Sequence, residues 1–183
     1  GDIIAEPGLL EEHLQSQKTD SRALVVGRLE DLPHDDIDPF YRLVGCPAFF
    51  ESGIDEKPLD FVDAYSGNLS LRRDSFREIG GFDEDFPKSG FEDTEFLYRA
   101  CQQGFRITYN PRAVGHHDSF ITFEGACRHL RSYQASAVLL MRKHPELKGA
   151  VPHLRDKQPI HWGEDDLQLF IRKVMRQVLA LPF

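Results

Sequence analysis

Between residues 68 and 111 the chain alternates strand patterns with helix patterns, and this order constrains its fold more than any other feature. The segment NLSLRR at 68–73 alternates in the manner of a strand, and FRITYNP at 105–111 is a β-rich run that ends in Asn and Pro. Between them, DSFREIGG at 74–81 and EDTEFLYRACQQG at 92–104 predict two helices. Strands and helices that follow one another along the chain predict an α/β fold.

The ends of these two helices carry recognisable signals. Asp74 is expected to cap the first helix, and Gly80 to stop it, because a residue without a side chain adopts the left-handed backbone of a helix end. Gly104 lies just past the second helix. The expected apolar face of that helix consists of Phe96, Leu97, Ala100 and Cys101.

Upstream of this region the sequence predicts one helix, one strand and a long loop. A helix over 6–17 is expected to present one apolar stripe, formed by Leu9, Leu10 and Leu14. Residues 23–26 read as a buried strand that Gly27 ends. Residues 30–60 are acidic and interrupted by prolines, which predicts loops and short turns, and PHDDIDP within them predicts a solvated loop in preference to a second metal site.

Downstream of Thr122 two amphipathic helices are predicted. The first ends before Pro145, and its apolar positions are Ala126, Leu130, Tyr133, Ala137 and Met141. The second begins near Asp165. Its expected inward residues are Leu167, Phe170, Ile171, Val174 and Val178, and its outward ones are Arg172, Lys173 and Arg176. Trp162 is expected to pack this helix onto the body, with stacking on a sugar ring as the alternative.

The composition excludes several classes of protein. The chain has 183 residues, of which 40% are hydrophobic and 28% charged, so an ordinary globular domain is expected. Its net charge of −8 argues against a nucleic-acid partner. Three cysteines without CxxC spacing indicate a reducing compartment and no zinc site. The longest apolar run, 135–141, is too short to cross a bilayer, so we expect a soluble, cytoplasmic protein.

Glu92 and Asp93 are the first candidates for chemistry. Acidic residues at a helix start complement the helix dipole and bind free N–H groups, which is an ordinary structural role. Here, however, Phe91 and Phe96 flank them, a glycine precedes them and a His pair follows one strand later. A carboxylate held partly out of water is suited to act as a general base on a hydroxyl.

The double histidine His116–His117 is ambiguous by itself. AVGHH at 113–117 either extends the strand at 105–111 or follows it, and an imidazole at a strand end is more often a hydrogen-bonded structural residue than a metal ligand. A ligand set with a nearby carboxylate would suit Mn²⁺ or Mg²⁺ completed by substrate phosphates. Such a site needs a second protein ligand.

The combined pattern resembles the C-terminal half of family 2 glycosyltransferases with the GT-A fold. It consists, in order, of GNLSLRR, GGFDEDF, EDTEFLYR, GFRITYNP and a His, and covers roughly residues 67–117. The resemblance implies that residues 1–122 are the C-terminal part of a GT-A-like catalytic domain, a mixed sheet with flanking helices that is truncated at its N-terminus. Residues 123–183 are then a helical extension packed on it.

Metal and substrate roles also follow only from this resemblance. GDIIAEP resembles the sequence after the first Asp of the family's D-x-D motif, so Asp2 corresponds to the second Asp, and the nucleotide-binding half is expected to be absent from this chain. Asp2 and His116 are the implied ligands of Mn²⁺ or Mg²⁺, with His117 as the alternative to His116. Asp93 is the implied base, and Glu92 contacts the acceptor. The implied substrate-binding residues are Gly67, Asn68, Asp83, Glu84 and Arg99, although Asp83 and Glu84 equally fit the capping of a turn.

The function that the resemblance implies is metal-dependent, inverting transfer of a sugar from a nucleotide-sugar donor to a carbohydrate or lipid-linked acceptor, as in polysaccharide biosynthesis. The chain alone is expected to be inactive if the nucleotide-binding half is missing. Peripheral association with the inner face of a membrane is left open. The alternatives are a non-catalytic module that binds carbohydrate or a partner, and a hydrolase that uses carboxylates from 92–93 and 83–84.

Overall fold

The computed structural model describes residues 3–32, 57–86, 90–118, 122–155, 159–163 and 165–179. Asp2 and most of the predicted loop at 30–60, including PHDDIDP, lie outside the described residues. The chain divides into two compact units, Gly1–Ser136 and Ala137–Phe183. The division falls within helix α5 (Phe123–Lys143). No helix in the described ranges combines the length and the apolar character needed to span a membrane.

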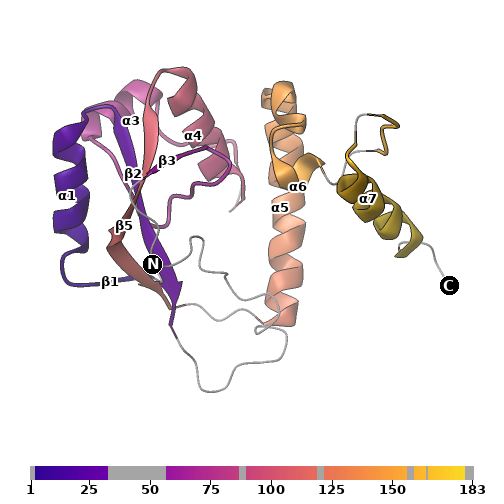
Figure 1. Ribbon diagram of the computed structural model, residues 1–183, viewed down its shortest axis with the longest axis horizontal. Coiled ribbons are helices and arrows are strands. Elements are labelled where there is room, and N and C mark those ends of the chain that lie inside the picture. Colours follow the sequence, from indigo (N-terminus) through magenta and orange to yellow (C-terminus); the bar gives the residue numbers. More distant parts are fainter. Residues whose placement is uncertain are drawn as a thin grey trace. The chain divides into compact units, whose positions relative to one another are not determined.

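A five-stranded mixed sheet lies at the centre of the first unit (Figure 1). Strands β1 (Ile3–Ala5), β5 (Arg106–His117), β2 (Ala23–Asp31) and β4 (Leu69–Ser70) follow in that order, and β3 (Lys57–Leu59) pairs with β5. β2 and β5 are parallel, whereas the other pairs are antiparallel. The mixed sheet with its flanking helices confirms the predicted α/β class.

Helices lie on both faces of this sheet. α1 (Leu9–Thr19) packs on one face, and its Ser16 hydroxyl accepts a hydrogen bond of 2.9 Å from the Asn110 amide of β5. Neighbouring strand residues point to opposite faces, and the other face carries the main core with α3 (Arg73–Ile79) and α4 (Glu92–Gln102). Buried members of that core are Leu24, Val26, Leu29, Tyr65, Ile79, Phe96, Leu97, Phe105, Ile107 and Tyr109.

The predicted end of the strand at Gly27 is wrong, because β2 continues through Gly27 to Asp31. β5 continues through Asn110 and Pro111 to His117, so AVGHH extends this strand, which was one of the two alternatives. A Cβ at Gly27 would lie 2.3 Å from the Ala113 carbonyl oxygen and 2.3 Å from the Asn68 amide nitrogen. Glycine therefore serves the close approach of neighbouring groups here, and a register shift beside it allows the pairing to continue.

The helix predictions are partly confirmed. α3 ends at Gly80, whose φ of +96° is left-handed, but Asp74 lies in its first turn and Arg72 occupies the cap position. α4 begins at Glu92 as predicted, and α5 ends before Pro145. The predicted stripe of α1 is wrong, because Leu9 is buried while Leu10 and Leu14 are exposed. His13, one turn after Leu9, is the other buried residue on that face.

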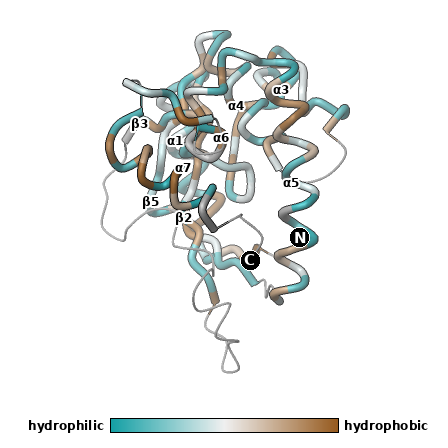
Figure 2. Tube along the Cα trace, turned by 90° about the vertical axis from the view of Figure 1, so that its right-hand side faces the viewer, coloured by the Kyte–Doolittle hydropathy of each residue, from teal (hydrophilic) through white to brown (hydrophobic). Residues whose placement is uncertain are grey.

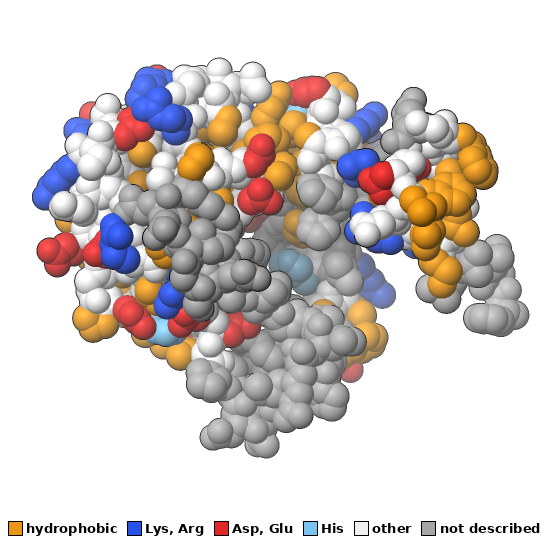
Figure 3. All heavy atoms as spheres, in the orientation of Figure 1, with side chains coloured by type: hydrophobic (Ala, Val, Ile, Leu, Met, Phe, Trp, Pro, Cys, Tyr) orange, Lys and Arg blue, Asp and Glu red, His pale blue; other side chains and the backbone are white. Residues whose placement is uncertain are grey.

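The second unit consists of the end of α5, a 3₁₀ turn η1 (Pro145–Lys148), α6 (Pro152–Arg155) and α7 (Leu167–Leu179). The predicted orientation of α7 is partly wrong: Arg172 and Arg176 are exposed as predicted, but Lys173, predicted to point outward, is buried. Leu169 and Lys173 are its buried residues, whereas exposed hydrophobic positions are Leu167, Ile171 and Met175. Figure 2 shows hydrophobic residues along α7, and Figure 3 shows such side chains gathered at the surface over it. Trp162 contacts Phe170 of α7 but is itself exposed.

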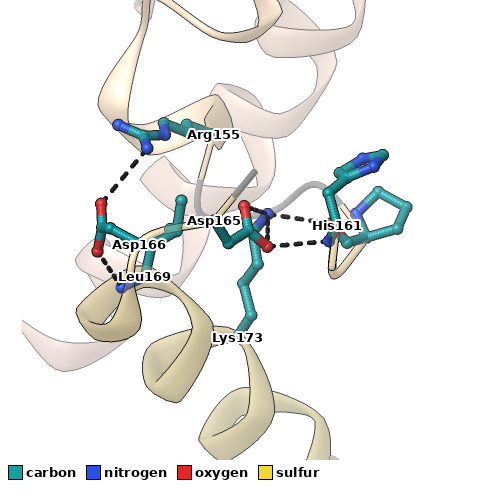
Figure 4. A network of polar contacts seen from close by, with 7 residues as sticks. Arg155, His161, Asp165, Asp166, Leu169 and Lys173 are labelled. Atoms are coloured by element: carbon teal, nitrogen blue, oxygen red, sulfur yellow. Dashed lines mark hydrogen bonds and ion pairs between the residues drawn. The ribbon is translucent and has the colours of Figure 1, made fainter. Parts of the chain in front are cut away.

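Lys173 is buried because its charge is neutralised. Its ammonium lies 2.7 and 2.9 Å from the two carboxylate oxygens of Asp165 and donates to the Pro159 carbonyl (Figure 4). The hydrogen bond from Lys173, followed by one from the His161 backbone N–H, lowers the pKa of Asp165. The neighbouring Asp166 caps α7 by accepting the Leu169 N–H at 2.9 Å.

Candidate active site

The start of α4 is built on a turn with unusual backbone angles. Gly90 has a φ of +121°, and Phe91, which precedes the helix, has a φ of +66°, which is uncommon for a residue with a side chain. A Cβ at Gly90 would lie 2.5 Å from the ring of Tyr133 on α5. Phe91 is buried and its ring centroid lies 4.4 Å from that of Tyr133. Aromatic packing therefore stabilises a turn that the backbone alone would not favour.

This turn presents the two predicted carboxylates, both half-buried. Asp93 accepts two hydrogen bonds from Ser66, one from the hydroxyl to Oδ1 at 2.6 Å and one from the backbone N–H to Oδ2 at 3.2 Å. Glu92 folds back and accepts the Gly90 N–H. Within the described residues neither carboxylate forms an ion pair with a cation. Neutral donors alone therefore hold this acidic pair.

Tyr133 completes the surroundings of the pair. Burial, and then the negative charges of Glu92 and Asp93, raise the pKa of its phenol. The sequence pattern placed Tyr133 only on the apolar side of a helix. Its ring packs on Phe91, the residue directly before the pair, so the ring lies beside the same site. No local signal marks it, because the contact joins residues some forty positions apart.

The residues on both sides of Ser66, Tyr65 and Asn68, are hydrogen-bonded to the sheet. The Tyr65 hydroxyl donates to the Gly27 carbonyl at 2.8 Å. Asn68 is buried, and its amide nitrogen donates to the carbonyls of Arg28 and Ala113 at 3.0 and 2.9 Å. Its Oδ1 lies 2.8 Å from His13 Nε2. Asn68, predicted to bind substrate, is thus placed inside the protein as a link between elements.

Gly67 lies between these anchored residues and is exposed. It shares the segment with Ser66, so the structure places it next to the residue that binds Asp93. A side chain at position 67 would approach Leu29, because a Cβ there would lie 3.2 Å from the Leu29 Cδ1. The predicted residues Gly67, Glu92 and Asp93 are therefore brought to one region of the unit.

Arg99, Asp83 and Glu84 lie at the other end of α4 and in the turn beside it. Arg99 forms an ion pair with the buried Glu95 at 2.7 Å. Its guanidinium also donates to the carbonyls of Ile79 and Gly81, both at 2.6 Å, so it holds the end of α3. Asp83 Oδ1 accepts the N–H of residue 85 at 3.0 Å, which is the capping role left open above, and Glu84 is exposed.

His116, the implied metal ligand, lies near the end of β5. Its Nε2 is 2.8 Å from a Glu6 carboxylate oxygen, and its Nδ1 is 4.0 Å from one of Glu30. β1 runs beside it, with Ile4 opposite His116, two residues after Asp2. Across the described ranges no three His, Cys, Asp or Glu side chains converge as a metal site. The nearby carboxylates are the donor type that suits Mn²⁺ or Mg²⁺.

Comparison with known proteins supports one kind of enzyme. A family described as the N-terminal domain of galactosyltransferase matches residues 56–121, which include Ser66, Glu92, Asp93 and His116. The chain is also 29% identical over 135 residues to a glucosyl-dolichyl phosphate glucuronosyltransferase of Haloferax volcanii. The chain carries a glycosyltransferase-like domain. The matches and the mixed sheet support the resemblance to family 2 glycosyltransferases and the GT-A-like fold.

The match to the Haloferax volcanii enzyme covers 65% of this chain but 41% of that enzyme. The chain therefore spans about two fifths of the length of the curated relative that it matches. The glycosyltransferase-like domain lies in the first unit, and the acidic pair of α4 lies inside the segment that the family matches.

Proposed function

We propose that this domain forms the acceptor side of a glycosyltransferase active site in which Asp93 removes the proton from the attacking acceptor hydroxyl. The supporting observation is the state of its carboxylate. It is half-buried, oriented by two hydrogen bonds from Ser66, and has no cationic partner among the described residues. A carboxylate that is oriented but not consumed by an ion pair can accept a proton from a bound hydroxyl.

The reaction then involves one bond formed and one broken. The acceptor oxygen attacks the anomeric carbon of a nucleotide-linked sugar, and its proton passes to Asp93. The bond between that carbon and the diphosphate breaks, so the nucleoside diphosphate leaves with the electron pair. Attack from the side opposite the leaving group inverts the anomeric centre. Glu92, held by the Gly90 N–H, contacts the acceptor beside the base.

Asp2 and His116 are the proposed ligands of a divalent cation, Mn²⁺ or Mg²⁺. When bound, such a cation supplies positive charge to the diphosphate group of the donor. His116 has the carboxylates of Glu6 and Glu30 beside it. In this proposal Glu6 keeps the imidazole oriented through its contact with Nε2.

The acceptor class follows from the relative. The printed name of the Haloferax volcanii enzyme describes transfer of glucuronosyl groups with glucosyl-dolichyl phosphate. We therefore propose a hexosyl-type donor and a carbohydrate or lipid-linked sugar as acceptor. The hydroxyl of either acceptor presents the same group to Asp93.

The test is turnover of UDP- and GDP-sugars with Mn²⁺, measured as release of nucleoside diphosphate. The full gene product and residues 1–183 should be assayed in parallel, since residues 1–183 alone are expected to release little. Asp93→Asn should lower the rate of release by about 10²- to 10⁴-fold. Asp74→Asn is the matched control, because Asp74 is also in the first turn of a helix but is exposed and paired with Arg77. If no donor turns over in the folded gene product, a non-catalytic binding role replaces this proposal.

A further inference from the structure

We propose that Ser66 is a positioning residue that fixes the carboxylate of Asp93 for proton transfer. This inference rests on the proposed function, because it assigns Ser66 a part in the same reaction. Ser66 acts through Asp93, so it is distinguished from the base itself. Neither its residue type nor its spacing marks it in the sequence.

The geometry of the contact supports this role. Ser66 donates its hydroxyl to Oδ1 at 2.6 Å and its backbone N–H to Oδ2 at 3.2 Å. Because two donors from one residue bind two different oxygens, they restrain both the position of the carboxylate and its rotation about its bond to the Cβ. Each carboxylate oxygen has more than one acceptor direction. The fork therefore orients Asp93 and leaves acceptor capacity for a substrate hydroxyl.

The donor of this fork is itself rigid. Tyr65, directly before Ser66, is tied to the Gly27 carbonyl. Two residues after Ser66, the Asn68 carbonyl accepts the Gly27 N–H at 2.8 Å and its side chain binds Arg28 and Ala113. Bonds on both sides thus fix Ser66 to the centre of the sheet. A positioning group is effective only when its own place is determined.

The position of Asp93 is fixed from a second direction as well. The left-handed turn at Gly90 and Phe91 packs on Tyr133, and this turn leads directly into α4. The turn determines where the Asp93 backbone begins, whereas Ser66 determines where its carboxylate points. Removal of the Ser66 hydroxyl should therefore change the orientation of the carboxylate and leave the helix in place.

The experiment compares Ser66→Ala with Ser66→Thr in the full gene product. Ser66→Ala should lower kcat roughly 10- to 100-fold, because misplacement of a catalytic group by about 1 Å has an effect of this order. KM for the nucleotide-sugar should stay unchanged, and Ser66→Thr should restore kcat because it keeps the hydroxyl. An unchanged kcat in Ser66→Ala would overturn the inference. So would equal losses in both variants together with a lower Tm, because these would mark a general structural defect.

A second measurement separates this inference from the proposed function. If the unsubstituted protein transfers no sugar, the function fails, and the contact is then tested by unfolding. Ser66→Ala, Asp93→Asn and the double variant should be non-additive by at least about threefold in the unfolding equilibrium constant. Additive effects would show that Ser66 does not hold Asp93 and would overturn the inference on their own.

Discussion

Helices α4 and α7 each begin beside a pair of adjacent acidic residues, Glu92–Asp93 at α4 and Asp165–Asp166 at α7. At α7 both carboxylates have ordinary structural roles. Asp165 neutralises the buried Lys173, and Asp166 caps the helix. At α4 the pair has no cationic partner within the described residues, and Ser66 and Gly90 supply only neutral donors.

The difference between these pairs lies in their partners and not in their sequence. Two adjacent acids at a helix start are usually explained by capping and by the helix dipole. That explanation is sufficient for α7. At α4 the pair follows a left-handed turn at Gly90 and Phe91, which packs on Tyr133, and Ser66 binds Asp93 through two hydrogen bonds. The left-handed turn costs stability, and the other contacts need partners from distant parts of the chain. Such an arrangement is expected at a functional site.

The largest effect on stability is expected from the glycines that precede the two pairs. Gly90→Ala should lower the free energy of unfolding by about 3 kcal/mol, because overlap with Tyr133 adds to the positive φ. Gly163→Ala, before α7, should cost only about 1 kcal/mol, because its φ is +86° but no atom of the described residues lies within 4 Å of a Cβ there. Urea unfolding of both variants measures the difference. Equal losses would show that the α4 turn is not fixed by Tyr133.

Asp165→Asn should have the next largest effect. It leaves the buried ammonium of Lys173 without its countercharge, so the Tm of the protein should fall by several degrees while kcat stays unchanged. Calorimetry and the turnover assay on the same variant provide the two readouts. A loss of kcat without a change in Tm would contradict the structural role given to this residue.

Acid should weaken the same interaction. The pKa of Asp165 is lowered in the folded protein from its ordinary value of 3.8. A lowered pKa in the folded state contributes stability that is complete above 3.8 and is lost as the pH falls through the folded value. The difference in stability between the protein and Asp165→Asn should therefore shrink below pH 3.8. If the stability difference between the two proteins instead grows as the pH falls, the pKa of Asp165 is not lowered in the folded protein.

The smallest effect is expected from Asp166→Asn. The variant keeps an oxygen that accepts the Leu169 N–H, and it loses only the ion pair with Arg155, whose two side chains are 46% and 62% exposed. Exposed pairs of this kind contribute little, so the change should be at most about 0.5 kcal/mol. A larger loss of unfolding free energy, measured in urea, would mean that the charge of Asp166, and not its capping hydrogen bond, stabilises α7.

Local signals predicted much of the framework. Gly80 ends α3 and Glu92 begins α4 as expected, because glycine and acidic residues mark helix ends through their own backbone preferences. The strand end at Gly27 was wrong because glycine also marks turns, and only Asn68 and Ala113 explain why β2 continues. Lys173 and Ile171 of α7 were assigned to the wrong sides because periodicity locates an apolar face but does not say which side packs.

The site was less accessible from the sequence than the fold. The acidic pair could be proposed from the sequence because its two residues are adjacent, and its role remains a proposal that the resemblance supplied. Ser66 and Tyr133 were missed because each reaches the pair from a distant part of the chain. Asn68 and Arg99 were assigned to substrate, whereas the structure places their polar groups on backbone carbonyls and, for Arg99, on Glu95. Such long-range bonds leave no pattern in neighbouring residues.

Similar acidic pairs thus serve different ends in our proposal, catalysis at α4 and stability at α7. The most direct test measures kcat and Tm for Asp93→Asn and Asp165→Asn in the full gene product. Asp93→Asn should lower kcat by about 10²- to 10⁴-fold with little change in Tm, as expected for loss of a general base. Asp165→Asn should lower Tm and leave kcat unchanged. If Asp93→Asn keeps its kcat and instead lowers Tm, both pairs are structural and the account is contradicted.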